Sequence, residues 1–299
     1  HGNRNKWLML LGGCFVPLHK FVLGAAQFGQ IYGLANQTGV PSYDELRKIK
    51  SVAEKLGIKA LDTASSYGDS EKAIGQIFDT SWKITSKCMM NGKPGEPATV
   101  WPEQVHQSLV LLKHSYLENL LLHHAKDINS GWYALRNLKD EGVVKKIGVS
   151  LYFSDDLDAV LSLPDLDVVQ ITLNIFDQRF LKTGALDRIK DKGVEVHVRS
   201  IFLQGLLLMQ PDQRPSYFSK WSKNFALLDG FLQQQNVSAK ELCINFVAHL
   251  AMVDKVVVGV ETADQLAELG QCIRYEPIPV SDSLACSDPK LLDPFLWQI

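Results

Sequence analysis

The sequence predicts an α/β fold: a (β/α)8 TIM barrel with an N-terminal β-hairpin that closes the barrel floor. Eight short apolar segments alternate with eight stretches of helical period, and no Pro/Ser-rich linker or charge block divides the 299 residues. An open doubly wound sheet also alternates strands with helices, but eight consecutive units favour a closed barrel. We expect a single domain over residues 1–299, with an N-terminal hairpin or extension (1–20), a barrel (21–273) and a C-terminal extension (274–299).

The expected strands are apolar on successive residues, which is typical of a parallel sheet covered on both faces. They are residues 21–26, 59–62, 83–87, 119–123, 146–150, 168–174, 194–200 and 255–258. Amphipathic stretches between them predict helices at residues 43–56, 70–78, 102–115, 131–141, 154–161, 181–192, 217–251 (as one or two helices) and 263–271.

The two ends of the chain carry separate signals. Gly12 and Gly13 lie between two apolar runs, a pattern that predicts a tight hairpin. The alternative is a processed or lipidated leader, because basic residues precede the apolar run and Cys14 follows the glycines; we prefer the hairpin. The extension at 274–299 contains four prolines and no clear period, so we expect it to lie over the barrel and help to build the site.

Composition argues against several classes of function. Lysine and arginine (31) nearly balance aspartate and glutamate (33), so the charge predicts no binding to nucleic acid or to an anionic membrane. No apolar run approaches the roughly 18 residues of a membrane span. The five cysteines are scattered without CxxC spacing, which favours a reduced, cytoplasmic setting. The oligomeric state is not predicted.

Residues with catalytic potential follow three successive strands. Asp62 ends the second expected strand and Tyr67 lies in the loop after it, while Lys87 ends the third strand and His123 and His124 the fourth. In a barrel, residues at these strand ends meet at one mouth. The sequence therefore predicts an acid, a phenol, an amine and an imidazole in one site.

The chemistry of this set is coherent. A nearby ammonium lowers the pKa of a tyrosine from its usual value near 10, and Lys87 is placed to do this for Tyr67. Asp62 is the expected counter-ion of Lys87, and His123 would orient a carbonyl oxygen beside the phenol. No metal site is predicted, because HExxH is absent and adjacent histidines on a strand point apart. The sequence also lacks GxGxxG, the P-loop and GxSxG.

Motifs along most of the chain, from Phe21 to about Cys272, strengthen this interpretation. In order they read FVLGAAQFGQIYG, LDTASSYGDSE, ITSK, LLLHHAKD, IGVS, VVQITLNIFDQR, RSIFLQGLL and VVVGVETADQL. Together they resemble the aldo-keto reductase family. The resemblance implies an NAD(P)-dependent carbonyl reductase with Tyr67 as general acid/base, completed by Asp62, Lys87 and His123. Ala125 stands where the family usually has a proline.

The resemblance also implies which residues hold NADP or NAD. Gly24, Ala25, Ala26 and Gln27 would line the nicotinamide, and Ser150 and Gln170 would bond its carboxamide. Ser200, Phe202, Gln204 and Gly205 would wrap the pyrophosphate, and Gly259, Val260, Glu261, Thr262 and Gln265 would take the adenosine end. Arg199 stands where many members have an aromatic ring stacked on the nicotinamide, and Leu151 where many have an asparagine.

Cofactor preference depends on charge at the adenosine end. Gly259 and Gln265 replace the lysine and arginine of members that select NADP, and Glu261 would repel a 2′-phosphate. Arg274 or Lys255 could still reach that phosphate. We expect both cofactors to bind, with dissociation constants within about a hundredfold of each other.

The expected substrate is a small carbonyl compound, with a weak preference for a sugar because the segment FVLGAAQFGQIYGLAN resembles a subgroup linked to sugar metabolism. Two alternatives are a non-catalytic nicotinamide-binding subunit on the same barrel and an unrelated TIM-barrel enzyme. The complete set of Asp62, Tyr67, Lys87 and His123 argues against the first.

Overall fold

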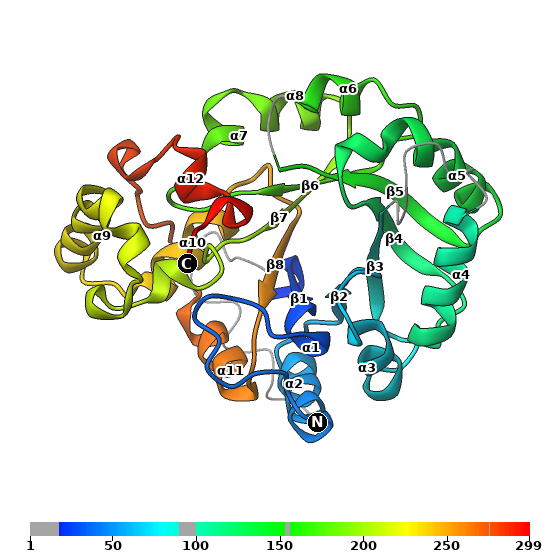
Figure 1. Ribbon diagram of the computed structural model, residues 1–299, viewed down its shortest axis with the longest axis horizontal. Coiled ribbons are helices and arrows are strands. Elements are labelled where there is room, and N and C mark those ends of the chain that lie inside the picture. Colours follow the sequence, from blue (N-terminus) through cyan, green and yellow to red (C-terminus); the bar gives the residue numbers. More distant parts are fainter. Residues whose placement is uncertain (1–17, 90–99, 153–155, 275) are drawn as a thin grey trace, which may run out of the picture.

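The strands form the predicted closed barrel. The computed structural model describes residues 18–89, 100–152, 156–274 and 276–299. Eight parallel strands pair in sequence order, and β8 pairs back with β1, where Val257 lies opposite Val22 (Figure 1). The strands are β1 (Phe21–Gly24), β2 (Ala60–Asp62), β3 (Lys83–Cys88), β4 (Leu117–Leu122), β5 (Val144–Ser150), β6 (Val168–Thr172), β7 (Glu195–Arg199) and β8 (Lys255–Gly259).

Helices surround the barrel, and side-chain caps mark the start of several of them. Ser42 caps α2 and Ser238 caps α10, each accepting a hydrogen bond from a backbone amide of the first turn. The helices are α1 (Ala26–Gly29), α2 (Tyr43–Lys55), α3 (Ser70–Ile77), α4 (Val100–Leu112), α5 (Ile128–Asp140), α6 (Leu157–Leu161), α7 (Arg179–Lys182), α8 (Ala185–Asp191), α9 (Ser222–Gln235), α10 (Ala239–Ala248), α11 (Ala263–Cys272) and α12 (Pro289–Leu292).

Most predicted elements differ from those observed by a few residues at their ends, and three differences have a clear local cause. The first strand ends at Gly24 rather than at residue 26, because the chain turns into the short helix α1. The helix predicted at 181–192 is broken by Gly184, whose φ of 69° is left-handed. The stretch 217–251 contains a 3-10 helix (Ser216–Trp221) followed by α9 and α10, which are separated by left-handed Asn236.

The predicted N-terminal hairpin lies almost wholly outside the described residues. The first described segment, Leu18–Lys20, is a turn of 3-10 helix at the N-terminal end of the barrel. The Lys20 ammonium donates to the carbonyl oxygens of Ala248 and Leu250, at 2.8 and 3.0 Å. Lys255 at the start of β8 donates to the carbonyl of His19. These contacts attach the start of the described chain to the barrel floor.

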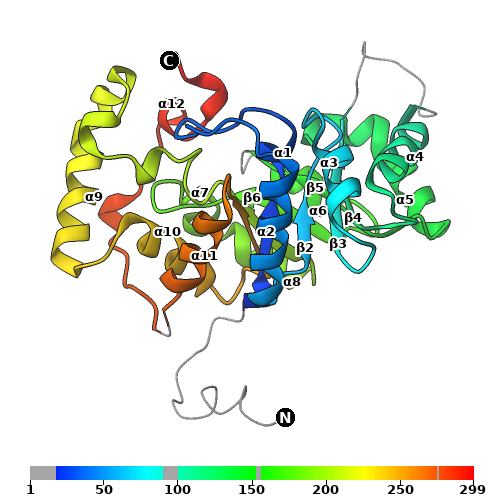
Figure 2. The same cartoon turned by 90° about the horizontal axis from the view of Figure 1, so that it is seen from below.

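Two hydrophobic clusters lie side by side in the described protein. The first fills the barrel and the layer beneath its helices. The second gathers the loop after β7, α9, α10 and the C-terminal extension, and it includes Phe176, Phe218 and Leu228 (Figure 2). Aromatic contacts attach the extension, since Trp297 packs edge-on against Phe218 at 5.0 Å between ring centroids. The extension is thereby held beside the barrel mouth.

No helix in the described ranges is long and apolar enough to cross a membrane. The four cysteines with described positions, Cys88, Cys243, Cys272 and Cys286, are free thiols, and Cys14 lies outside those positions. Nor do the described residues contain a group of three or more histidine, cysteine, aspartate or glutamate side chains placed to hold a metal ion.

Candidate active site

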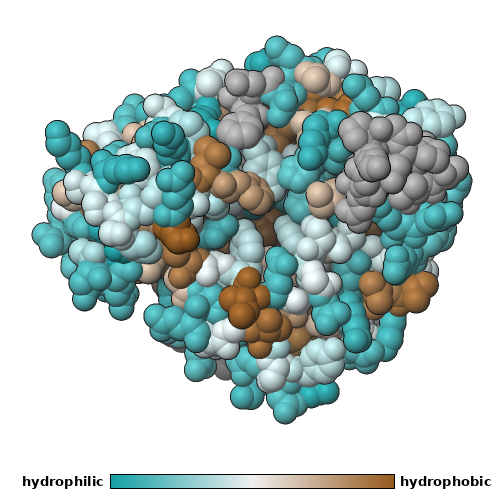
Figure 3. Space-filling model, viewed as in Figure 1, coloured by the Kyte–Doolittle hydropathy of each residue, from teal (hydrophilic) through white to brown (hydrophobic). Residues whose placement is uncertain are grey.

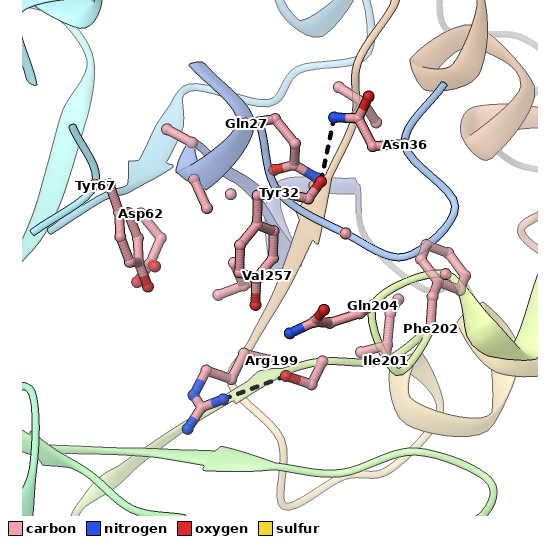
Figure 4. A pocket seen from close by; sticks show the side chains of 18 of the residues that line it. Gln27, Tyr32, Asn36, Asp62, Tyr67, Arg199, Ile201, Phe202, Gln204 and Val257 are labelled. Carbon is pink, nitrogen blue, oxygen red and sulfur yellow. Dashed lines mark hydrogen bonds between the residues drawn. The ribbon is translucent and has the colours of Figure 1, made fainter. Parts of the chain in front are cut away.

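A cavity of about 480 Å³ opens at the carboxyl ends of the strands. Figure 3 shows this face as mainly hydrophilic, with a hollow at its centre that is bordered in part by hydrophobic residues. The lining includes Asp62 and Tyr67, which lie close together in Figure 4, and also His123, Gln265 and Lys240. The position agrees with the rule that barrel sites lie at the C-terminal face.

Asp62 and Lys87 form a buried ion pair beneath this cavity. The Lys87 ammonium contacts Asp62 Oδ1 and donates to the carbonyl of Thr63 at 2.9 Å, while Gln170 Nε2 donates to Asp62 Oδ2 at 2.7 Å. Neither charged side chain is more than 5% exposed. The predicted counter-ion relation is therefore present, and both charges are held in fixed positions.

Tyr67 lies above this pair, with the Lys87 nitrogen 5.3 Å from its ring centroid. The sequence-based expectation that the pKa of Tyr67 is lowered overall is wrong for this structure. Burial of the phenol, and next the Asp62 carboxylate, raise the pKa well above its usual value near 10, whereas Arg199 acts in the opposite direction. Tyr67 is therefore a protonated phenol at neutral pH, which is the form of a proton donor.

His123 lies against Tyr67, with ring centroids 5.7 Å apart and the rings nearly perpendicular. Burial, and then the charge of Lys87, lower the pKa of His123 to about 2, so the imidazole is neutral. Its Nδ1 lies 3.3 Å from Ser66 Oγ. A neutral imidazole beside the phenol can orient a carbonyl oxygen without adding charge.

Most positions predicted to hold a cofactor line this same cavity. They are Gly24, Ala25, Ala26, Gln27, Arg199, Ser200, Phe202, Gln204, Gly205, Gly259, Val260, Glu261 and Gln265. Thr262, Ser150 and Gln170 are not among the lining residues. Thr262 instead caps α11 by accepting from the Gln265 amide, and Ser150 and Gln170 are fully buried.

The residues present fit a nicotinamide dinucleotide. Ser150 Oγ and Gln170 Oε1, on paired positions of β5 and β6, are buried polar atoms without a hydrogen-bond partner, and such atoms normally have one. A carboxamide supplies both the donor and the acceptor that they lack. Along the loop after β7, Ser200 and Gln204 have left-handed φ values of 60° and 53°. Loops with such turns can direct backbone amides at phosphate.

The adenosine end differs from the sequence-based expectation in its basic residues. Lys255 cannot reach a cofactor phosphate because it lies at the floor, at the opposite end of β8. Arg274 is not a lining residue and pairs with Glu241 at 2.9 Å. The cation on this part of the wall is Lys240 from α10, which forms an ion pair with Glu268.

At the C-terminal end of β8, Gly259 lies against the side chain of Gln27. A Cβ at Gly259 would come within 2.4 Å of the Gln27 amide nitrogen, so the Gln27 side chain occupies that space. Gln265 is also engaged, since its Oε1 accepts from the Glu261 amide at 2.7 Å. Glu261 itself accepts from the Thr38 hydroxyl.

Sequence reasoning missed several lining residues. Tyr32 and Asn36 come from the α1–α2 loop (residues 30–42), Tyr152 follows β5, and Phe295 comes from the C-terminal extension. Burial, and then the neighbouring Tyr67, raise the pKa of Tyr32 to about 12. His124 was set aside in favour of His123, yet it too lines the cavity, stacked between His123 and Tyr152. No local pattern marks these residues, because the path of their loops decides their place.

The comparisons with known proteins give the family of this chain. The sequence model of the Aldo/keto reductase family matches residues 20–280. The chain belongs to that family. It is 26% identical to a D-arabinose 1-dehydrogenase of Saccharomyces cerevisiae, covering 82% of this chain and 80% of that protein. It is 27% identical to an NADH-specific methylglyoxal reductase of Escherichia coli, over 52% of this chain and 56% of that protein.

Solved structures show the same fold. An aldo-keto reductase from Bacillus halodurans in its holo form has a TM-score of 0.71 and 22% identity, over 87% of this chain and 88% of that chain. The glycerol dehydrogenase of Gluconobacter oxydans has a TM-score of 0.69 and 18% identity over the same shares. Because its family and its named relatives are oxidoreductases, this aldo-keto reductase is an oxidoreductase as well.

Proposed function

We propose that this aldo-keto reductase interconverts a carbonyl compound and an alcohol with NADP or NAD, and that Tyr67 is the general acid/base. The observation that carries the proposal is the convergence of the Asp62–Lys87 pair, Tyr67 and His123 at one end of a cavity. The rest of that cavity follows the ends of β1, β7 and β8, where the cofactor positions are expected.

Each residue has a distinct part in the proton transfer. The protonated Tyr67 donates to the carbonyl oxygen as negative charge develops there. The Lys87 ammonium, held by Asp62, then stabilises the phenolate that this transfer leaves. His123 is neutral and positions the carbonyl oxygen without competing for the proton. The raised pKa of Tyr67 in the free protein keeps the phenol protonated before the transfer.

The cofactor, when bound, supplies or accepts the hydride. Its carboxamide would meet Ser150 and Gln170, and its phosphates the loop from Ser200 to Gly205. Glu261, Gln265 and Lys240 would face the adenosine end. Residues at the nicotinamide end and at the adenosine end of the cavity would therefore both hold the cofactor.

A non-catalytic nicotinamide-binding subunit is the alternative, and the site weighs against it. A binding role needs no buried ion pair beneath a phenol, whereas proton transfer does. The substrate is proposed to be a small carbonyl compound or a sugar. The D-arabinose 1-dehydrogenase and the methylglyoxal reductase among its relatives are named for both kinds of substrate.

Tyr67→Phe tests the proposal, because it removes the proton donor and keeps the ring. We expect turnover to fall roughly a hundredfold or more, while the affinity for the reduced cofactor changes little. Turnover is followed by nicotinamide absorbance on a panel of aldehydes, ketones and sugars, and affinity by fluorescence titration. Tyr133→Phe, an exposed position on α5, is the matched control. Turnover by Tyr67→Phe within a few-fold of wild type would contradict the assignment.

A further inference from the structure

Arg199 is a cation in the cavity that the proton-transfer scheme does not use. It ends β7 and is half-buried. Its Nη1 donates to Ser200 Oγ at 3.2 Å, and its Nη2 lies 3.5 Å from the Leu151 carbonyl oxygen. Among the described residues it forms no ion pair with a carboxylate. A half-buried guanidinium whose partners are neutral can still bind an anion.

The Arg199 side chain is directed toward the catalytic end. In Figure 4 it runs away from Phe202 and Gln204 toward the side of the cavity that holds Tyr67 and Asp62. Its guanidinium carbon lies 4.1 Å from the ring centroid of Tyr152, and Tyr152 stacks in turn on His124. The stacking fixes the plane of the guanidinium, so its N–H edge keeps a set direction.

Electrostatic coupling supports the same placement. The charge of Arg199 acts on Tyr67, Tyr32, His123 and His124, and it lowers the pKa of each of them. Asp62, the carboxylate on that wall, is already engaged by Lys87 and Gln170. The catalytic end therefore has an uncompensated positive charge between aromatic walls.

We propose that the substrate is an oxo acid or an acidic sugar, and that Arg199 binds its carboxylate while the carbonyl faces Tyr67. A single guanidinium and aromatic walls suit a monoanionic carboxylate better than a phosphate dianion. The other cation on the cavity wall within the described chain, Lys240, lies at the far end and is paired with Glu268. Arg199 is thus a specificity-determining residue. This inference rests on the proposed function, because it takes the Tyr67 end as the place of the carbonyl.

The test measures equilibrium binding rather than turnover, so that it can fail independently of the proposed function. The protein is saturated with oxidised cofactor and titrated calorimetrically with two matched pairs: 4-carboxybenzaldehyde against 4-formylbenzamide, and glucuronate against glucuronamide. Within a pair the ligands differ in charge at one group. We expect wild type to prefer the carboxylate of at least one pair by roughly tenfold to a hundredfold.

Variants assign that preference to a residue. Arg199→Met is expected to abolish it, with Arg199→Gln as a second neutral variant if the first does not fold. Arg199→Lys, which keeps the charge without the planar fork, should retain only part of it. Lys240→Met should retain it in full. Because Arg199 and Lys240 both line the cavity of the expected cofactor, cofactor fluorescence titration of each variant first gives the cofactor concentration that saturates it.

Several results would overturn the inference. One is equal binding of acid and amide by wild type in both pairs. Another is a preference that persists in Arg199→Met and Arg199→Gln, which would place the anion at a different group. Tighter binding of glucose 6-phosphate than of glucuronate would show a phosphate site instead. If the carboxylate preference holds but the panel of carbonyl compounds is not turned over, the proposed function fails and the anion site stands.

Discussion

At the scale of single residues, burial has shifted the titration of the site in one direction: toward neutral forms. Tyr67 and Tyr32 are kept protonated and His123 is kept unprotonated, each mainly because burial disfavours the charged form. Beside these groups, Asp62 and Lys87 form an ion pair with each other. A protonated phenol and an unprotonated imidazole suit a reaction in which negative charge develops on the substrate oxygen.

The neutral state of His123 predicts how stability depends on pH. Its pKa is lowered from 6.5 to about 2 in the folded protein, so below pH 6.5 the unfolded chain takes up a proton that the folded protein does not. Stability is therefore lost as pH falls. Between pH 7 and pH 5 this one group should cost about 2 kcal/mol of unfolding free energy.

Urea unfolding of wild type and His123→Gln at the two pH values measures the effect. We expect the variant to lose about 2 kcal/mol less than wild type over this interval. His106→Gln, an exposed position on α4, should behave as wild type. An equal pH dependence in wild type and His123→Gln would show that His123 is not kept neutral by the fold.

The residue types at the strand ends could be predicted from the sequence, whereas the direction of their pKa shifts could not. Asp62, Lys87 and His123 each follow an apolar run, so the barrel rule places them without knowledge of any loop. The pKa of Tyr67 was predicted in the wrong direction because the Lys87 charge is held by Asp62, and because burial outweighs the remaining charge effects. Pairing and burial are tertiary properties that one sequence does not display.

At the scale of elements, the α1–α2 loop closes over the cavity. The amide of Leu34 donates to the carbonyl of Gln204 at 2.8 Å, and the Thr38 hydroxyl donates to Glu261 at 3.2 Å. The loop thus connects the segments after β7 and β8 that we propose face the cofactor phosphates and adenosine. Its path could not be predicted from sequence, because it depends on contacts with residues more than 160 positions away.

The α1–α2 loop can pack against residue 205 only because that residue is a glycine and has no Cβ. A Cβ there would lie 2.5 Å from the Cβ of Ala35, and the φ of 88° is itself unfavourable for other residues. We expect Gly205→Ala to displace the loop and weaken cofactor binding roughly tenfold. Gly142→Ala is the matched control, because its φ of 75° is similar and nothing lies within 4 Å of its added Cβ.

Cofactor fluorescence titration and thermal unfolding separate the two effects. Both variants should lose stability on the order of 1 kcal/mol from backbone strain. The loss of affinity is expected for Gly205→Ala alone. Equal cofactor affinity in both variants would show that the α1–α2 loop does not hold the cofactor.

Helix α10 supplies a lysine to the cavity wall, where Gly259 and Gln265 of the β8–α11 segment carry no positive charge. Neither of these two residues can form an ion pair with a 2′-phosphate, so we expect the described cation that approaches it to be Lys240, in competition with Glu268. We expect wild type to bind NADPH and NADH within about a hundredfold of each other. Lys240→Met should weaken NADPH binding by roughly tenfold without affecting NADH.

Two further variants complete this comparison of NADPH and NADH affinities. Glu268→Gln should strengthen NADPH binding, since it frees the Lys240 ammonium. Lys255→Met, at the barrel floor, should change neither affinity. A preference of wild type for NADPH of several thousandfold would show a phosphate clamp other than Lys240.

At the scale of the whole molecule, the proposed catalytic groups lie on the barrel, which the first hydrophobic cluster fills, while part of the wall facing them depends on the second cluster. Asp62, Tyr67, Lys87 and His123 are carried by the barrel. Phe295, which packs on Tyr152 at 5.7 Å, is held through the C-terminal extension. That extension is fixed by Trp221 Nε1, which donates to Asp288, and by Trp297 packed on Phe218. Sequence composition predicted that the extension lies over the barrel, but not which aromatic residues anchor it.

The two clusters should therefore respond separately to the loss of a core side chain. Phe218 is 2% exposed and contacts Tyr217, Trp221, Phe225 and Trp297. Replacing it with alanine removes about 3 to 5 kcal/mol of packing from the C-terminal cluster. We expect faster amide exchange in α9, α12 and the segment around Phe295, with the strands still protected. The KM for carbonyl substrates should rise more than the dissociation constant of the cofactor.

Leu138→Ala provides the comparison within the barrel cluster, since Leu138 is 1% exposed on α5. Hydrogen exchange followed by mass spectrometry should show its effect in α5 and neighbouring strands, with the C-terminal extension unchanged. Uniform loss of protection in Phe218→Ala would mean that the two clusters unfold as one cooperative unit. In that case Phe295 would be as firmly placed as the catalytic residues, and the wall that it forms would not adjust independently to different substrates.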